Sequence, residues 1–175
     1  FLPFFRFGFF SHLMPPNLAS FAELAATDGK KAFVQAMEHM RESFGVDNIT
    51  LYYGKDMKKI YSFGADIPNA DNALYIFSHE FRSIMGEGKR CLEVSFLNKL
   101  SETAPSFCKR MEEERISSTI QCYIGGGLDD IKGLVTFNKL KEASQWADYE
   151  VDCARIFASV LSYMSVGING IETIY

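Results

Sequence analysis

The stretch from residue 115 to residue 165 constrains the fold more than any other part of the chain. Ile120, Cys122 and Ile124 alternate with polar or amphipathic residues, which is the period-two pattern of a strand with one buried face. Glycines and aspartates follow as turn residues, and the next run, 134–137, is again rich in β-forming residues. The stretch therefore predicts a β-hairpin.

A long amphipathic helix is predicted directly after this hairpin. We expect a bulge or a close backbone approach at Gly133, where the second strand starts. From Trp146 onward the spacing of apolar residues changes to that of a helix with one buried stripe. The members of this stripe are Tyr149, Cys153, Ile156, Phe157, Val160, Leu161 and Met164.

This order of residues resembles the C-terminal half of a GAF domain, the small sensory fold of cyclic-nucleotide phosphodiesterases, phytochromes and many bacterial signalling proteins. The family shows a short turn into a strand, then a Gly-containing strand, then a Trp at the entry to the closing helix. The corresponding segments here are 116–120, 133–137 and 146–150. The resemblance covers roughly residues 28 to 166.

Alternating and helical apolar patterns also predict the elements before the hairpin. We expect strands near 49–53, 59–63 and 91–97, and helices ending at Phe44, spanning 72–85 and starting at Pro105. The run 112–114 of three glutamates is expected on the solvated face of the last of these helices.

The predicted order is helix–β–β–helix–β–helix–β–β–helix, which indicates an α+β fold. We expect a central antiparallel sheet of about five to six strands flanked by helices, with the GAF-like, profilin-like or PAS-like architecture. The expected divisions are an aromatic N-terminal arm and short helix at 1–27, a GAF-like sensory domain at 28–166, and a C-terminal tail or linker start at 167–175.

Composition and charge restrict the function classes. The net charge is −4 and Lys and Arg do not cluster, so a nucleic-acid partner is not expected. No apolar run reaches the length of about 18 residues that a membrane span needs. The four cysteines form no CxxC pair and no Cys/His metal spacing, so reduced thiols and a cytoplasmic location are expected, with no metal site. Because the sequence lacks an initiator Met, we expect a fragment of a longer protein.

The GAF resemblance implies where a ligand would bind. Ligand-binding members hold small molecules between the sheet and two mid-chain helices, and such pockets are mostly apolar. A filled core explains the same apolar residues equally well. The candidate ligand-binding residues are Tyr75, Phe77, Phe96, Phe107, Met111, Ile120 and Cys122.

Three ligands of the family are disfavoured by the sequence, which leaves the cofactor unknown. Cyclic GMP binders carry an extended motif of which only Asn138 and Lys139 are matched. Bilin binders attach the chromophore through a Cys beside a His, a pair that this sequence lacks. Haem binders need an axial His, and only His79 lies near the expected pocket.

The expected function is that of a non-catalytic sensory or regulatory domain in a multidomain bacterial signal-transduction protein. By family association, the output is expected to be a diguanylate cyclase (GGDEF) or a phosphodiesterase, in cyclic-dinucleotide signalling. The apolar stripes at 33–44 and 149–164 suggest a homodimer formed through the terminal helices. One alternative is a structural dimerisation module with a filled pocket. The other is a small cysteine-dependent enzyme, similar to a free methionine sulfoxide reductase, that uses Cys108 or Cys122.

Overall fold

The computed structural model describes residues 34–35 and 37–167. The arm expected at 1–27 and all but the first residue of the tail expected at 167–175 lie outside these residues. Residues 37–44 are helical and lead directly into the sheet.

A five-stranded antiparallel sheet forms the centre of the domain, with the strand order β2-β1-β5-β4-β3. This confirms the expected α+β fold with a central antiparallel sheet. The strands are β1 (Asn48–Tyr53), β2 (Lys58–Gly64), β3 (Cys91–Val94), β4 (Ser118–Gly127) and β5 (Asp130–Lys139). β2 and β3 lie at the two edges, so β1, β5 and β4 pair on both sides.

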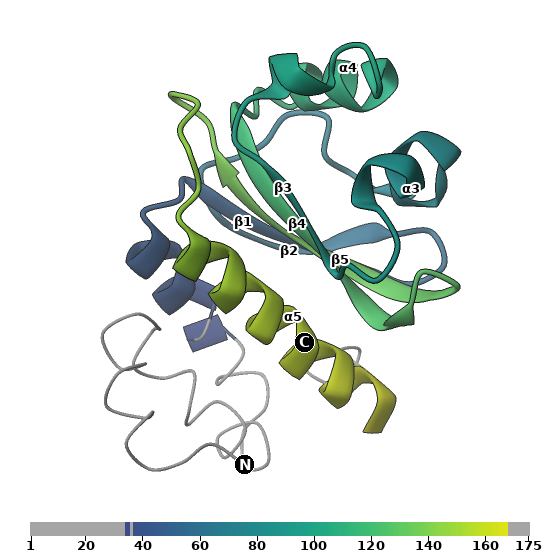
Figure 1. The fold of residues 1–175 in the computed structure, drawn as a ribbon. Helices are drawn as coiled ribbons and strands as arrows, with labels where there is room; N and C mark the ends of the chain where they lie inside the picture. Colours follow the sequence, from purple (N-terminus) through teal and green to yellow (C-terminus); the bar gives the residue numbers. More distant parts are fainter. Residues whose placement is uncertain (1–33, 36, 168–175) are drawn as a thin grey trace.

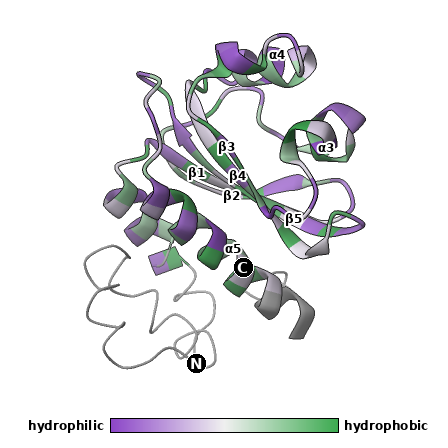
Figure 2. Cartoon of the chain, in the orientation of Figure 1, coloured by the Kyte–Doolittle hydropathy of each residue, from purple (hydrophilic) through white to green (hydrophobic). Residues whose placement is uncertain are grey.

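Helices cover both faces of this sheet. The long closing helix and the helical residues 37–44 lie on one side, whereas α3 and α4 lie on the other (Figure 1). The helical elements after the first hairpin are η1 (Leu74–Phe77), α3 (His79–Met85), η2 (Leu97–Leu100), α4 (Pro105–Glu113) and α5 (Asp148–Gly167). Both α3 and α5 contain hydrophilic as well as hydrophobic residues, as expected for amphipathic helices (Figure 2).

Two of the expected elements differ from the sequence prediction. The helix expected over 72–85 is interrupted at Ser78, whose hydroxyl accepts a hydrogen bond from the Phe81 amide and caps α3. Leu74 and Phe77, which precede this break, are 48% and 42% exposed. The third strand ends at Val94 rather than at residue 97, because the chain turns into η2.

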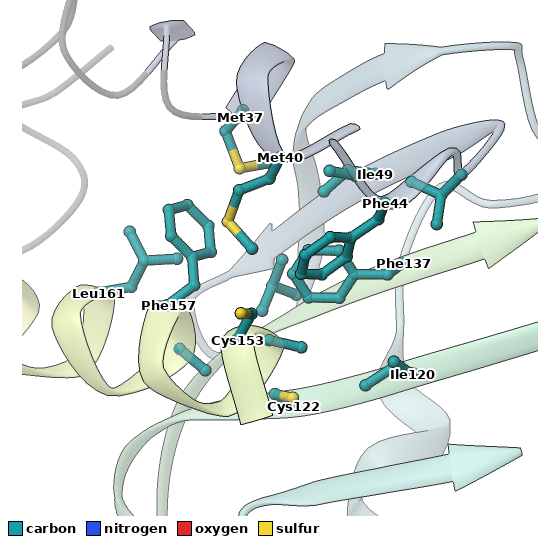
Figure 3. Close-up of a cluster of buried hydrophobic side chains, with 14 of the residues drawn as sticks. Met37, Met40, Phe44, Ile49, Ile120, Cys122, Phe137, Cys153, Phe157 and Leu161 are labelled. Carbon is teal, nitrogen blue, oxygen red and sulfur yellow. The ribbon is translucent and has the colours of Figure 1, made fainter. Parts of the chain in front are cut away.

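The hydrophobic core is divided between the two faces. Under α5, the buried side chains come from residues 37–46, from β1, β4 and β5, and from α5 itself (Figure 3). Cys153, Phe157 and Leu161 of the predicted stripe are buried there, but Tyr149 is 43% exposed. Under α3 and α4 lies the second cluster, which includes Phe81, Phe107 and Met111. The two clusters together bury both faces of the three central strands, β1, β5 and β4, whereas the edge strand β2 is partly exposed.

Close packing against the neighbouring strand explains why position 133 is a glycine. A Cβ atom at this position would lie 2.6 Å from the Tyr52 carbonyl oxygen of the neighbouring strand. The close approach expected from the sequence is therefore confirmed.

Candidate functional site

A patch of polar side chains lies on the sheet face opposite α5. It has two rows, each crossing β1, β5 and β4. Asn48, Asn138 and Thr119 are paired across the strands in one row, and Thr50, Thr136 and Gln121 in the other. All six side chains are at most 2% exposed. We call these six residues the polar patch.

Hydrogen bonds connect the polar patch into one chain of donors and acceptors. Thr119 Oγ1 donates to Asn138 Oδ1 at 2.7 Å, and Asn138 Nδ2 donates to Asn48 Oδ1 at 3.0 Å. Asn48 Nδ2 in turn donates to the Ala65 carbonyl oxygen at 2.8 Å, beyond the end of β2. Buried polar groups without such partners would be strongly destabilising, so this pairing is what makes the patch tolerable inside the fold.

Tyr75 of η1 closes the chain at its other end. Its hydroxyl donates to Gln121 Oε1 at 2.7 Å, and Gln121 Nε2 then lies 3.4 Å from Thr119 Oγ1 and 3.5 Å from Met111 Sδ. Burial raises the pKa of Tyr75 well above its ordinary value, so the phenol stays protonated and donates. The ring of Tyr75 also packs edge-on against Phe81 and Phe107.

A buried ion pair lies at the C-terminal end of α4, beside Tyr75. Arg110 Nε contacts Glu114 Oε2 at 2.6 Å, and the Arg110 guanidinium lies 5.3 Å from the centre of the Tyr75 ring. Glu114 is 2% exposed, so the prediction that it lies on the solvated face of α4 is wrong. Glu112 and Glu113 are exposed, as expected. Burial raises the pKa of Glu114 to about 7, although Arg110 acts in the opposite direction.

An open surface groove of about 410 Å³ lies next to this ion pair. The Asn72 carbonyl, on its wall, accepts a hydrogen bond from Arg110 Nη2. The groove is lined by Asp56, Lys58, Lys59, Asp71, Asn72 and Leu74. Arg110 therefore links a solvent-exposed hollow to the buried Glu114 and Tyr75.

The structure brings together three of the seven predicted site residues. Tyr75, Phe107 and Met111 lie on the α3/α4 side of the sheet and are connected through Gln121 or through ring contacts. Phe77 is 42% exposed, and Phe96 is half-buried at the start of η2.

Ile120 and Cys122 lie on the opposite face, in the cluster under α5 (Figure 3), so their expected placement in the pocket wall is wrong. The alternation of β4 was interpreted correctly as a strand. Both faces of β4 are buried, however, and its polar residues are the ones that face α4. The missed signal was the recurrence of Thr, Asn and Gln at alternate positions in all three central strands.

The expectation of reduced thiols is also wrong for one pair of cysteines. Cys91 and Cys122 form a disulfide between β3 and β4, where the two residues are directly paired. Cys108 and Cys153 are free and buried. Burial raises the pKa of the Cys108 thiol above its ordinary value. Burial also raises the pKa of the Cys153 thiol, to about 11. Both shifts disfavour the reactive thiolate form. Of the two residues named for the enzyme alternative, Cys122 has no free thiol while the disulfide is intact, and Cys108 has a thiol whose thiolate form is disfavoured by burial.

The described part of the chain shows neither a metal-binding cluster nor a membrane-spanning helix. Among residues 34–35 and 37–167, no group of three or more His, Cys, Asp or Glu side chains is placed to hold a metal ion. Over the same residues, no helix is long and apolar enough to cross a membrane.

No protein-family model and no curated protein matches the sequence, but many solved structures share its fold. A far-red-absorbing dark-state domain with bound biliverdin IXa has a TM-score of 0.63 at 14% identity, covering 83% of this chain and 95% of that chain. The domain of a putative sensor histidine kinase from Sinorhizobium meliloti has a TM-score of 0.57 at 11% identity, covering 80% and 92%. The photoproduct state of a GAF domain from Synechocystis has a TM-score of 0.50 at 13% identity, covering 78% and 95%. The fold is therefore GAF-like.

These comparisons correct the expectation that bilins are disfavoured, because a domain of this fold contains bound biliverdin. Bilins were disfavoured because the sequence lacks a Cys next to a His. The structure provides a free thiol, Cys108, on α4 next to Phe107 of the aromatic cluster. Cys108 Sγ lies 3.4 Å from the Leu97 carbonyl oxygen, so its side chain would have to turn to reach a ligand on the polar patch.

Proposed function

We propose that this chain is a sensory GAF-like domain of a signalling protein and that it binds a small ligand over the polar patch. The observation that carries the proposal is the complete burial of six uncharged polar side chains on the sheet face under α3 and α4. If that face only filled a core, apolar residues would stabilise it more, as they do under α5. A ligand with its own donors and acceptors would exchange hydrogen bonds with the patch.

The chemistry of the patch restricts the ligand that we propose. Its side chains are neutral amides and hydroxyls, which offer both donors and acceptors and no net charge. The aromatic side chains of Tyr75 and Phe107 lie at its border and offer flat apolar contact. These features favour an uncharged, planar, hydrogen-bonding part of a ligand, entering where Tyr75 now covers Gln121.

Native mass spectrometry of the purified chain is the direct test. We expect extra mass that is lost on denaturation, or that appears after incubation with a ligand. Biliverdin is the first probe, because a structurally similar domain contains it; when bound, such a group supplies light absorption. The proposal predicts that Gln121→Leu reduces binding, whereas Ile120→Val, on the other face of the same strand, leaves it unchanged.

Two outcomes distinguish the modes of binding. If biliverdin binds covalently, its mass remains after denaturation of the wild-type chain and is lost after denaturation of Cys108→Ala. If neither biliverdin nor any co-purified molecule binds, and Gln121→Leu stabilises the fold, the structural module with a filled pocket is the better explanation.

Other parts of the expected function remain predictions. The apolar stripes of residues 37–44 and of α5 pack against the domain's own sheet. They therefore no longer indicate a homodimer, which stays a prediction. The bacterial source, the cytoplasmic location, and the diguanylate cyclase or phosphodiesterase output likewise stay predictions. In the proposed arrangement α5 carries the signal, because it packs directly on β4.

A further inference from the structure

The disulfide between Cys91 and Cys122 is placed where it joins an edge strand to the sheet. Among the described strands, β3 pairs only with β4, over four residue pairs, and Cys91 lies directly opposite Cys122 in this register. Apart from the disulfide, β3 is held to β4 by a short ladder. The covalent bond therefore determines how firmly this edge of the sheet is fixed.

The same edge supports α5. Cys122 is fully buried in the cluster beneath α5 (Figure 3). Cys91 packs against that cluster. α5 packs on both β4 and β3. Cys91 is only half-buried, so a thiol in solution reaches its sulfur more readily than that of Cys122.

Arg90, immediately before Cys91, connects this edge to α5 through polar contacts. Its Nη1 atom donates to Ser162 Oγ of α5 at 2.8 Å and to the carbonyl oxygens of Tyr123 and Gly125 at 3.2 and 3.1 Å. Ser162 Oγ also accepts a hydrogen bond from the Gly125 amide at 3.0 Å. The backbone position that anchors the Arg90 side chain is thus adjacent to the disulfide.

We infer that the Cys91–Cys122 pair is a thiol-based redox switch that controls how α5 docks on β3 and β4. The inference rests on the proposed function only in giving α5 the role of the signal-carrying element. Oxidised, the pair fixes β3 and Arg90 against α5. Reduced, β3 keeps its four-pair ladder and its packing but loses the covalent bond to β4, and the contact between Arg90 and Ser162 loosens.

The chemical step is a thiol–disulfide exchange with a dithiol reductant. One donor thiolate attacks Cys91 Sγ, and Cys122 leaves as a thiolate that takes up a proton. The second donor thiolate attacks the donor sulfur of the mixed disulfide and releases Cys91, which also takes up a proton. Two electrons and two protons pass to the protein, and the donor leaves as its cyclic disulfide.

Alkylation followed by intact-mass measurement establishes the redox state. The chain contains four cysteines, of which two are disulfide-bonded and two are free. With iodoacetamide in denaturant, we expect two added groups without reductant and four after dithiothreitol. Four added groups in protein purified and held without reductant would overturn the inference.

Hydrogen exchange on the oxidised and reduced chain, without ligand, then tests the switch. A closed loop with a sequence separation of 31 shifts the folding equilibrium by on the order of 100- to 1,000-fold. If the disulfide only stabilised the whole fold, its reduction would accelerate exchange in every strongly protected segment by a similar factor. The switch predicts an acceleration of roughly 10-fold or more in α5 and β3, with β1 and β2, at the far side of the sheet, changing much less.

Variants separate the disulfide from simple loss of packing. Cys91→Ala/Cys122→Ala should behave like the reduced chain whether or not dithiothreitol is present. Cys153→Ala, which removes a buried sulfur from the same cluster, should keep the wild-type response. Arg90→Ala should accelerate exchange in α5 while the disulfide stays intact. A uniform acceleration on reduction, or an unchanged α5 in Arg90→Ala, would overturn the inference; neither outcome depends on ligand binding.

Discussion

Replacing Glu114 with glutamine should change how the stability of this protein depends on pH. Glu114 is 2% exposed and its pKa is about 7 in the folded chain, raised by burial from the ordinary value of 4.5. Arg110, at 2.6 Å, and Lys59 favour the charged form, whereas Glu113 disfavours it. The folded chain therefore holds a proton on Glu114 over a pH range in which the unfolded chain has released it.

The sign of the effect follows from this difference in bound protons. Below about pH 4.5 both states are protonated, and the group contributes no pH dependence. Between 4.5 and about 7 the folded state binds more protons, so the free energy of unfolding falls as the pH rises. The shift of 7 − 4.5 = 2.5 units corresponds to a loss of up to about 3 kcal/mol, since one unit is about 1.4 kcal/mol.

Urea unfolding of the wild type and Glu114→Gln, at roughly pH 5 and about pH 8, measures this effect. Trp146 is the sole tryptophan of the chain and is buried, so its fluorescence reports unfolding in both proteins. The stability of the wild type relative to the variant should fall by up to about 3 kcal/mol over this interval. Glu112→Gln, at an exposed position of the same helix, should keep the wild-type dependence. A relative stability that rises with pH would show that the attraction of Arg110 outweighs burial, and would refute the reasoning.

Two further predictions concern single hydrogen bonds inside the fold. Thr119→Val keeps the side-chain shape but leaves Asn138 Oδ1 without the 2.7 Å hydrogen bond, so we expect a loss of about 1–3 kcal/mol in urea unfolding. Thr103→Val, at an exposed position, should change stability by less than about 0.5 kcal/mol, and equal effects of the two variants would argue against the described network. Trp146→Phe removes the 3.2 Å hydrogen bond from the indole to the Val94 carbonyl, and circular dichroism should show a loss of about 1–3 kcal/mol; an unchanged midpoint would contradict that bond.

Local patterns in the sequence were sufficient for most of the fold. Period-two alternation identified β4, helical spacing identified α5, and Pro105 marked the first turn of α4, because each depends on neighbouring residues only. The break at Ser78 was also detectable, since a Ser three residues before the Phe81 amide, with Glu80 in the first turn, is an N-cap pattern.

Features that depend on strand pairing were not accessible in the same way. The disulfide requires that Cys91 and Cys122 lie opposite each other, and no local spacing rule relates residues that are 31 positions apart. The burial of Glu114 depends on where the end of α4 packs, so a run of three glutamates alone suggested a solvated face. The polar patch became evident only when the register aligned Asn48 with Asn138 and Thr119 with Asn138.

The two faces of β4 suggest how a ligand on one side would be felt on the other. Gln121 belongs to the polar patch, whereas its neighbours Ile120 and Cys122 pack beneath α5. A ligand that took over the hydrogen bond between Tyr75 and Gln121 would act on the same strand that holds the disulfide. Such a ligand shifts α5 only if it binds one arrangement of β4 more tightly than the other. Because the disulfide fixes β4 to β3, we expect the two inputs to be coupled, with the oxidised pair limiting the response of α5 to the ligand.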